Sequence, residues 1–160
     1  MPRFFTGEVD GRSAVITGED ARHIALSLRM KPGEPLTVCD SAGHDYQCVV
    51  EAVDPGRVDL RVEAVAPSAG EPGVEITLYQ ALPKGDKLEM IVQKAVELGV
   101  GRIVPVLTRR CVSRPDEKSM KKKLERLNRI ALEAAKQCGR GRVPPVEPLV
   151  GFEEAVARMK

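Results

Sequence analysis

Hydrophobic and polar positions alternate over short distances in residues 1–70, where brief apolar runs are separated by turn-forming residues. Short alternating runs are typical of β-strands, and turns of glycine, proline and aspartate at near-regular spacing are typical of a small β-barrel. A short helical pattern, with Ile24, Ala25 and Leu28 on one side, follows the first run. The expected strands are residues 14–17, 36–39, 45–52 and 57–65.

The period of the pattern changes after residues 66–73, which read APSAGEPG and have the composition of a linker. Residues 74–82 are expected to form a strand, residues 86–98 a helix with one apolar face, and residues 102–106 a second strand. A strand, a helix and a strand joined by short turns form a βαβ unit, whose strands are parallel and whose crossover is right-handed.

A longer helix is expected near residues 116–138, because six apolar or small residues recur there at intervals of four and three. Gly139 suits the position just after its end. A third strand is expected near residues 143–146 and a helix at residues 152–159. The helical stripe consists of Met120, Leu124, Leu127, Ala131, Ala134 and Cys138.

The first strand-to-helix turn, QALPKGDKLE at residues 80–89, combines capping residues with one candidate ligand. Asp86 and Glu89 have the spacing of a capping box, and Gly99 suits the position after the helix. Lys84 precedes a helix amino terminus, where anions bind. It is therefore either a phosphate or carboxylate ligand or a solvated side chain, and the pattern leaves both readings open.

Composition bounds the size and the class of the protein. The 160 residues, 42% of them hydrophobic and 30% charged, suit one domain or one small domain plus part of another. The sequence has no apolar run long enough to cross a membrane and no visible secretion signal at its start. The four cysteines form no CxxC pair and the two histidines are not grouped with them, so we expect no metal site and reduced thiols.

Charge divides the chain in the same place as the linker. Residues 1–70 hold 7 basic and 11 acidic side chains, whereas residues 71–160 hold 18 and 12. Within residues 108–142 the counts are 12 and 4, a net charge of +8. An acidic first half and a basic second half predict two modules with different partners, and the basic one suits a polyanion.

Two basic segments carry the candidate chemistry. Arg109 and Arg110 follow a predicted strand, at the edge where open α/β sheets hold ligands. Lys121 and Lys122 lie on the polar side of the longer helix, where a phosphate-binding face and a solvated charged face are both consistent with the pattern. Cys111 is interpreted as a buried small residue rather than a nucleophile. The sequence contains neither GxGxxG nor GxxxxGK[ST], so a nucleotide-binding loop of those kinds is not expected.

The order of several motifs resembles that of one known family. The resemblance covers essentially the whole chain and includes, in the first half, His23-Ile24, Leu28-Arg29 and Gly33. The sequence is similar to the bacterial RsmE family of 16S ribosomal RNA methyltransferases. In the second half, the matching motifs are QALPKGDK at residues 80–87, QKAVELGV at 93–100, Arg110-Cys111, EAAKQCGR at 133–140 and Val143-Pro144.

The resemblance implies a mixed α/β fold, with a PUA-like, RNA-binding β-barrel at residues 1–70. The amino-terminal part of a SPOUT-type methyltransferase domain is then expected at residues 71–160. It also implies a cytoplasmic homodimer that transfers a methyl group from S-adenosylmethionine to N3 of a uridine in 16S rRNA of the small ribosomal subunit.

The resemblance also suggests which residues act. Arg110 and Arg140 match motif positions and are candidates for an electrostatic part in catalysis. The glycine-rich GPEGG and LGxRILRxETA segments of the family are absent, so the knot and the cofactor-binding residues are expected beyond Lys160. A non-enzymatic RNA-binding fragment and a metabolic α/β enzyme with Lys84 at its substrate are the alternatives. The expected RNA-binding residues are Arg29, Lys84, Arg109, Arg110, Lys121, Lys122, Arg140 and Arg142.

Overall fold

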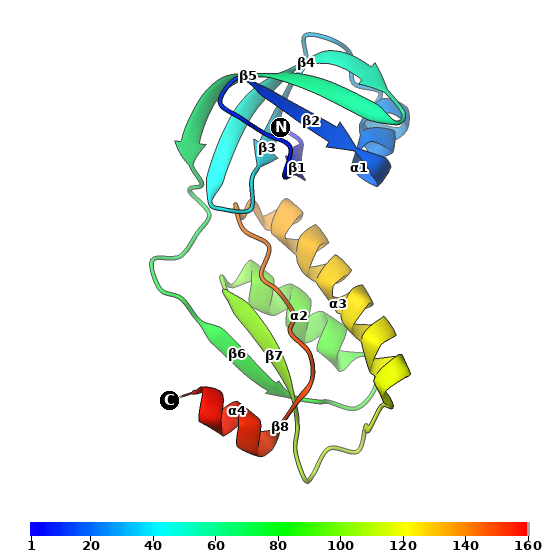
Figure 1. Ribbon diagram of the computed structural model, residues 1–160, viewed down its shortest axis with the longest axis vertical. Helices are drawn as coiled ribbons and strands as arrows, with labels where there is room; N and C mark the ends of the chain where they lie inside the picture. Colours follow the sequence, from blue (N-terminus) through cyan, green and yellow to red (C-terminus); the bar gives the residue numbers. More distant parts are fainter. Residues whose placement is uncertain (160) are drawn as a thin grey trace. The chain divides into compact units, whose positions relative to one another are not determined.

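The structure is a computed structural model that describes residues 1–159, and it contains two compact units (Figure 1). The first unit comprises Met1–Glu71 together with Gly139–Arg142, and the second comprises Pro72–Cys138 and Val143–Lys160. The sequence placed residues 139–142 in the second domain. In the structure these four residues instead belong with the first unit, because their backbone and side chains bond to it.

The first unit is built on a curled five-stranded sheet with the order β1-β3-β4-β5-β2. Only the β1–β3 pair is parallel, and the other neighbours are antiparallel. The four strands that the sequence predicts are confirmed, whereas β1 was not predicted because its three residues are too short to show a period. The strands are β1 (Arg3–Phe5), β2 (Ser13–Thr17), β3 (Pro35–Cys39), β4 (His44–Asp54) and β5 (Arg57–Pro67).

One face of this sheet forms the core of the first unit. Alternate residues of the strands point into it, as the period of two requires. Ala21 and Ile24 cover it from the short helical segments α1 (Gly18–Arg22) and η1 (His23–Leu28). Leu28 is 41% exposed, so its expected place on the apolar side is wrong. Leu28 is the last residue of η1, a π-helix, and it lies directly before the left-handed turn at Arg29.

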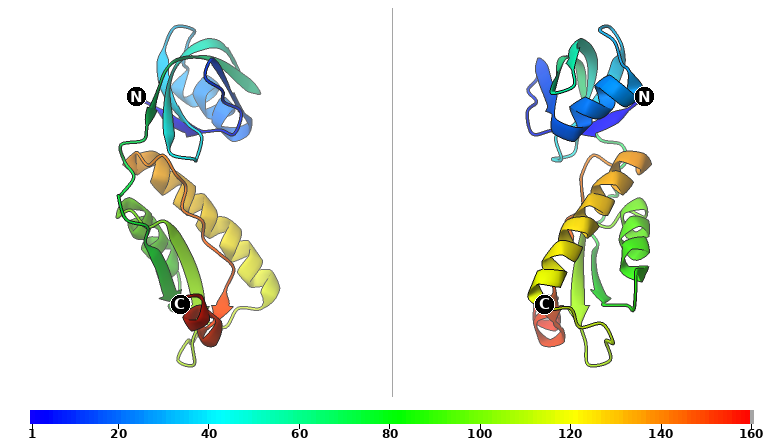
Figure 2. Two further views of the ribbon diagram at one scale, coloured as in Figure 1. Left: turned by 60° about the vertical axis from the view of Figure 1, so that its left-hand side comes forward. Right: turned by 90° about the vertical axis from the view of Figure 1, so that its right-hand side faces the viewer.

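The second unit contains a three-stranded parallel sheet with the order β6-β7-β8. β6 (Thr77–Ala81), α2 (Lys87–Glu97) and β7 (Arg102–Leu107) form the expected βαβ unit. β7 is buried over four consecutive residues, Ile103–Val106, as is usual for a parallel strand that is covered on both sides. Figure 2 shows β6 and β7 side by side in both views.

The longest helix, α3 (Glu117–Cys138), packs along α2. The predicted apolar stripe is buried at most of its positions, although Leu124 is half-buried and Cys138 is exposed. Gly139 has φ +76°, as expected after a helix end. Beyond it, α4 (Phe152–Arg158) confirms the predicted last helix and contacts β7 and β8.

The predicted third strand at residues 143–146 is wrong. That segment makes only an isolated parallel bridge, from Val146 to Ile103. The paired strand is β8 (Val150–Gly151), which is four residues further along the chain. Pro144, Pro145 and Pro148 lack backbone N–H donors, which limits regular pairing before Val150. No helix among residues 1–159 is both long and apolar enough to cross a membrane.

The ends of α2 differ in how well they match the sequence. Gly99 follows the helix with φ +97°, as predicted, and a side chain there would meet the ring of Pro72. The capping box at the start is wrong. Asp86 has φ −91° and ψ 8°, its side chain makes no cap hydrogen bond, and the backbone N–H of Glu89 donates to its carbonyl instead. An effective cap residue has extended backbone geometry, which Asp86 does not have.

Candidate functional site

The carboxyl ends of β6 and β7 lie at the same edge of the parallel sheet. The register pairs Ala81 with Val106, and the N–H of Leu82 donates to the carbonyl of Val106 over 3.0 Å. Each strand runs directly into a basic loop, which contains Lys84 after β6 and residues 109 and 110 after β7. Open α/β sheets bind ligands at this edge, so the arrangement defines the candidate site.

Hydrogen bonds hold the loop that follows β7 in one shape. The backbone N–H of Thr108 donates to Cys111 Sγ over 3.3 Å, and Thr108 Oγ1 lies 3.2 Å from the same sulfur. Arg114 Nη2 donates to the carbonyl oxygens of Thr108 and Arg109 at 3.4 and 3.3 Å. The side chain of Cys111 is buried, as predicted. The loop is thus tied back on itself, which leaves its two adjacent arginines outside.

The thiol of Cys111 has a structural role in the loop and is not placed to act as a nucleophile. Its hydrogen bonds with the Thr108 side chain and backbone lower the pKa of the thiol. Neither histidine of the chain is in the second unit, so no imidazole of that unit could act as a base for it. The sulfur instead closes the loop and so positions the two exposed arginines.

Three cations at this edge form what we call the carboxyl-edge cluster, defined by Lys84, Arg109 and Arg110. All three side chains are exposed, and none forms an ion pair with another of the residues 1–159. Cations that are not neutralised within the chain are available to phosphate groups, which arginine binds in a bidentate manner. The cluster therefore suits a polyanionic ligand.

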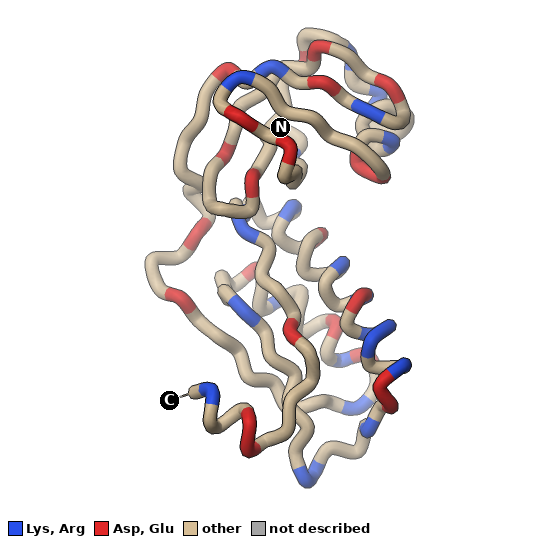
Figure 3. Tube along the Cα trace, viewed as in Figure 1, with Lys and Arg blue, Asp and Glu red and all other residues tan. Residues whose placement is uncertain are grey.

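The polar side of α3 adds further positive charge to the second unit. Lys121 and Lys122 are exposed, and Figure 3 shows lysine and arginine positions along this helix with acidic positions between them. Arg126 differs, because its Nη2 lies 2.8 Å from the carboxylate of Glu89 on α2. That ion pair joins α2 and α3. It also neutralises Arg126, for which the sequence pattern indicated no partner.

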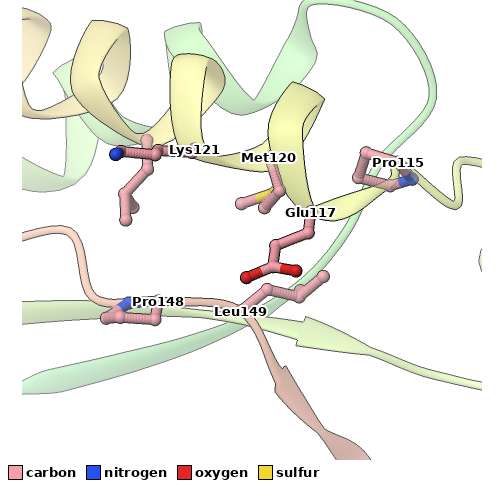
Figure 4. A pocket seen from close by; sticks show the side chains of 7 residues that line it. Pro115, Glu117, Met120, Lys121, Pro148 and Leu149 are labelled. Atoms are coloured by element: carbon pink, nitrogen blue, oxygen red, sulfur yellow. The ribbon is translucent and has the colours of Figure 1, made fainter.

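A hollow of about 450 Å³ lies between the first turns of α3 and the segment before β8 (Figure 4). Its lining is mainly apolar and includes Met120, Leu124 and Leu149. Glu117 and Lys121 also line the hollow and add one negative and one positive charge. It is not lined by any member of the carboxyl-edge cluster. The sequence stripe predicted Met120 as a core residue; it is buried, and it is one of the residues that line this hollow.

The remaining predicted site residues lie in the first unit. Arg140 is only 3% exposed, and its Nη2 lies 2.7 Å from the carboxylate of Glu71. Arg142 is exposed and its Nη2 donates to the carbonyl of Ala42 over 3.4 Å. Arg29 is exposed and has φ 51°, a left-handed conformation that is uncommon outside glycine. The structure therefore does not bring Arg140 and Arg110 together within one unit.

Sequence reasoning missed a polar network that holds the Gly139–Arg142 segment in the first unit. Arg3 donates through both terminal nitrogens to Asp45, at 2.9 and 2.6 Å, and Arg3 Nη1 also donates to the carbonyl of Arg140 over 3.2 Å. Ser68 donates to Asp45 as well. Residues separated by more than a hundred positions meet here, and no local period or motif signals such a contact.

Comparison with known proteins matches both units. The family model for an RNA methyltransferase domain matches residues 70–160, and the model for an RNA methyltransferase PUA domain matches residues 16–63. Among residues 1–159 there is no group of three or more histidine, cysteine, aspartate or glutamate side chains that could hold a metal ion. Because the model for the RNA methyltransferase domain covers residues 70–160, more than half of the chain, the chain belongs to the RNA methyltransferases.

Individual relatives narrow the class. The chain is 37% identical over 145 residues to "Ribosomal RNA small subunit methyltransferase E" of Bacillus subtilis, and 32% identical over 154 residues to the protein of the same name from Mycobacterium tuberculosis. These matches cover 91% and 94% of this chain but only 57% of each relative. Within the RNA methyltransferases, the chain is a member of the RsmE family, of the SPOUT superfamily, and spans just over half the length of these relatives.

Solved structures agree with this assignment. The chain is 33% identical to ribosomal RNA small subunit methyltransferase E of Neisseria gonorrhoeae bound to S-adenosyl methionine, with a TM-score of 0.88 over 100% of this chain and 66% of that one. A methyltransferase of Legionella pneumophila in complex with the same cofactor gives 32% identity and a TM-score of 0.84, over 97% and 65% of the two chains. The mixed α/β fold with a PUA-type first unit is thereby confirmed.

Proposed function

We propose that this chain is part of an enzyme that methylates N3 of a uridine in 16S rRNA, with S-adenosylmethionine as the methyl donor. The observation that carries the proposal is the 37% identity to a ribosomal RNA small subunit methyltransferase E, which extends over 91% of the chain and so over both units. The carboxyl-edge cluster supports it, because unpaired cations at the ligand-binding edge suit an RNA backbone. The enzyme acts in the cytoplasm on the small ribosomal subunit, as a homodimer.

The two parts of the chain divide this work. Residues 1–70 are proposed as a PUA-like RNA-binding domain, and residues 71–160, apart from the Gly139–Arg142 segment that joins the first unit, as the first part of the methyltransferase domain. Phosphate contacts position the RNA without reading its sequence. Arg140 also belonged to the expected set, but its guanidinium is buried against Glu71, so it is not available to a phosphate. The residues proposed to bind RNA are Arg29, Lys84, Arg109, Arg110, Lys121, Lys122 and Arg142.

The described residues do not fit S-adenosylmethionine. No side-chain nitrogen or oxygen that is buried in residues 1–159 lacks a hydrogen-bond partner, so no polar group there waits for the adenine or the ribose. The carboxyl edge is also basic, and it would repel the sulfonium cation of the cofactor. We therefore place the cofactor site in the part of the family's length that this chain does not match, and derive no step through it.

Isothermal titration calorimetry tests that placement directly. S-adenosylmethionine titrated into residues 1–160 should give no saturable heat, because the chain lacks a fitted cradle for it. Binding with a dissociation constant in the micromolar range would show that the residues present do hold the cofactor, and would overturn this part of the proposal.

Arg110 is the stronger of the two candidate catalytic residues. The N3 proton of uridine must leave before or during methyl transfer, and the negative charge that develops is stabilised by a fixed cation nearby. Arg110 is exposed at the carboxyl edge and has no acidic partner within residues 1–159. The guanidinium of Arg140 is buried against Glu71, so its geometry supports a structural role better than an electrostatic one in catalysis.

Methyl transfer by the complete protein that contains this chain tests the function. With labelled S-adenosylmethionine and isolated small ribosomal subunits, we expect 3-methyluridine among the nucleosides of digested 16S rRNA. An Arg110→Ala change should lower kcat by about a hundredfold, the usual effect of removing one group that stabilises a transition-state charge. Arg57→Ala is the matched control, since Arg57 is paired with Asp59 in the first unit. Unchanged turnover in Arg110→Ala would remove that residue from the mechanism, and absence of 3-methyluridine would reject the proposed reaction.

A further inference from the structure

A second hollow, of about 320 Å³, lies at the carboxyl ends of β7 and β8. The register pairs Leu107 with Gly151, which places the residues that follow the two strands next to each other. The volume is at the lower end of the range for ligand sites, about 300–1,000 Å³. We call this the β7–β8 hollow, and its lining includes Thr108, Arg109, Arg114, Gly151, Phe152 and Glu153.

The aromatic ring in this hollow is unusually exposed. The chain has three phenylalanines, of which Phe4 is buried in the first unit and Phe152 is 60% exposed. α4 is anchored by Ala155, which is buried, and so Phe152 is not needed to hold the helix in place. An exposed aromatic face beside arginine side chains is the arrangement on which proteins stack the bases of single-stranded RNA.

The hollow is lined by side chains of both charges, two arginines and one glutamate. Arg109 has no acidic partner within residues 1–159, whereas Arg114 is used in holding the loop through its bonds to two carbonyl oxygens. Glu153 contributes the one carboxylate, next to the ring of Phe152 along the chain. A phosphate is attracted to Arg109 and repelled by Glu153, while a carboxylate accepts hydrogen bonds from the N–H groups of a base edge. These charges favour one orientation of a nucleotide, with its phosphate toward Arg109 and its base toward Phe152.

We propose that the β7–β8 hollow binds one nucleotide of single-stranded RNA, with the base stacked on Phe152 and the phosphate held by Arg109. This subsite rests on the proposed function, because that function makes RNA the partner of the chain. The subsite adds the place where one nucleotide of that RNA binds. Binding of a nucleotide in the β7–β8 hollow requires neither the cofactor nor methyl transfer, so it can be measured without them.

Fluorescence anisotropy with a labelled single-stranded RNA of six nucleotides tests the subsite, using residues 1–160 as the protein. Phe152→Leu should weaken binding about tenfold, because a base–aromatic stack is lost while apolar volume is kept, and should leave the salt dependence unchanged. Arg109→Gln should weaken binding and reduce the slope of log affinity against log salt by about 0.7, the value for one phosphate contact on a single strand.

Two variants on the same helix serve as matched controls. Arg158→Gln removes one positive charge from α4, and Val156→Ala removes one exposed apolar group, but neither residue lines the hollow. Both should change affinity less than twofold. Wild-type binding that Phe152→Leu and Arg109→Gln leave unaltered would overturn the subsite and leave the RNA partner standing. No binding by the wild type would reject the subsite and the RNA-binding part of the proposed function together.

Discussion

Glu71 shows how a single carboxylate holds distant parts of the chain. It accepts hydrogen bonds from Arg140 Nε and Nη2 at 3.3 and 2.7 Å, and from the backbone N–H groups of Gly141 and Arg142, both at 3.0 Å. Burial raises the pKa of Glu71, but these bonds and the charge of Arg140 lower it by more, so the pKa lies below its usual value. The charged form is therefore the one that stabilises the fold.

Glu71→Gln should destabilise the protein by about 3 kcal/mol, because it removes the ion pair that Glu71 makes with the buried guanidinium of Arg140. Urea unfolding followed by circular dichroism measures the change. Glu63→Gln is the matched control, since Glu63 also pairs with an arginine but is 45% exposed, and the expected loss there is below about 1 kcal/mol. Equal losses in the two variants would contradict the importance of burial.

The same carboxylates predict how stability changes with pH. Asp45, the carboxylate that pairs with Arg3 in the first unit, is similar to Glu71. Burial raises the pKa of Asp45, but its hydrogen bonds with Arg3 and Ser68 lower it by more, so the pKa values of both carboxylates lie below their usual values. Because the folded pKa values lie below the unfolded values of about 3.9 and 4.3, the contribution is fully present above about pH 5 and is lost as pH falls through the folded values. The stability difference between wild type and Glu71→Gln should shrink as pH is lowered from 6 to 3. A difference that stays constant over that range would contradict the linkage.

At the scale of elements, α3 has the cap that the sequence assigned to α2. The backbone N–H of Ser119 donates to the carboxylate of Asp116 over 2.7 Å, and this bond also lowers the pKa of Asp116. Asp86 makes no such bond. The two aspartates occupy the same position relative to their helices, so they form a natural pair for comparison.

Asp116→Ala should cost about 1 kcal/mol of stability, whereas Asp86→Ala should cost a few tenths at most, because only the first change removes a cap hydrogen bond. Chemical denaturation of the two variants under identical conditions gives the comparison. If Asp86→Ala were the more damaging change, the backbone geometry described at the start of α2 would be contradicted.

Periodicity explains why most elements were predictable and why their details were not. The strands of the first unit and the helices α2 and α3 repeat apolar residues often enough to show a period, and their bounds match within a few residues. β1 and β8 have three and two residues, too few for any period. The carboxyl-edge position of Arg109 and Arg110 followed from strand order, but the exposure of Phe152 beside them depends on how α4 packs, which a residue pattern does not record.

At the scale of the whole molecule, the first unit is discontinuous in sequence. The chain leaves it after Glu71, completes most of the second unit, and returns for four residues before leaving again. No prediction from composition could find this, because the linker at residues 66–73 is the one visible boundary, and GRGR at residues 139–142 looks like an ordinary basic loop. The contacts with Glu71 and Arg3 are what assign it to the first unit.

A fragment of residues 1–75 should therefore be less stable than the first unit within the chain, by at least the amount that Glu71→Gln costs the whole protein. In that fragment Glu71→Gln should have almost no further effect, since its partner Arg140 is already gone, and the two changes are then not additive. Urea unfolding of the four proteins, chain and fragment with and without the substitution, completes the cycle. A full second loss in the fragment would show that Glu71 acts through other residues.

The return of Gly139–Arg142 to the first unit also sets an order of events during translation. The first unit lacks its final contacts until about 70 further residues have been made after Glu71, which takes roughly 4 to 14 s at ordinary bacterial elongation rates. During that interval Arg140 has not yet been synthesised, so Glu71 lacks the guanidinium with which it pairs in the folded protein. The amino-terminal unit is thus the first to be synthesised, yet it is completed only after most of the second unit has been made.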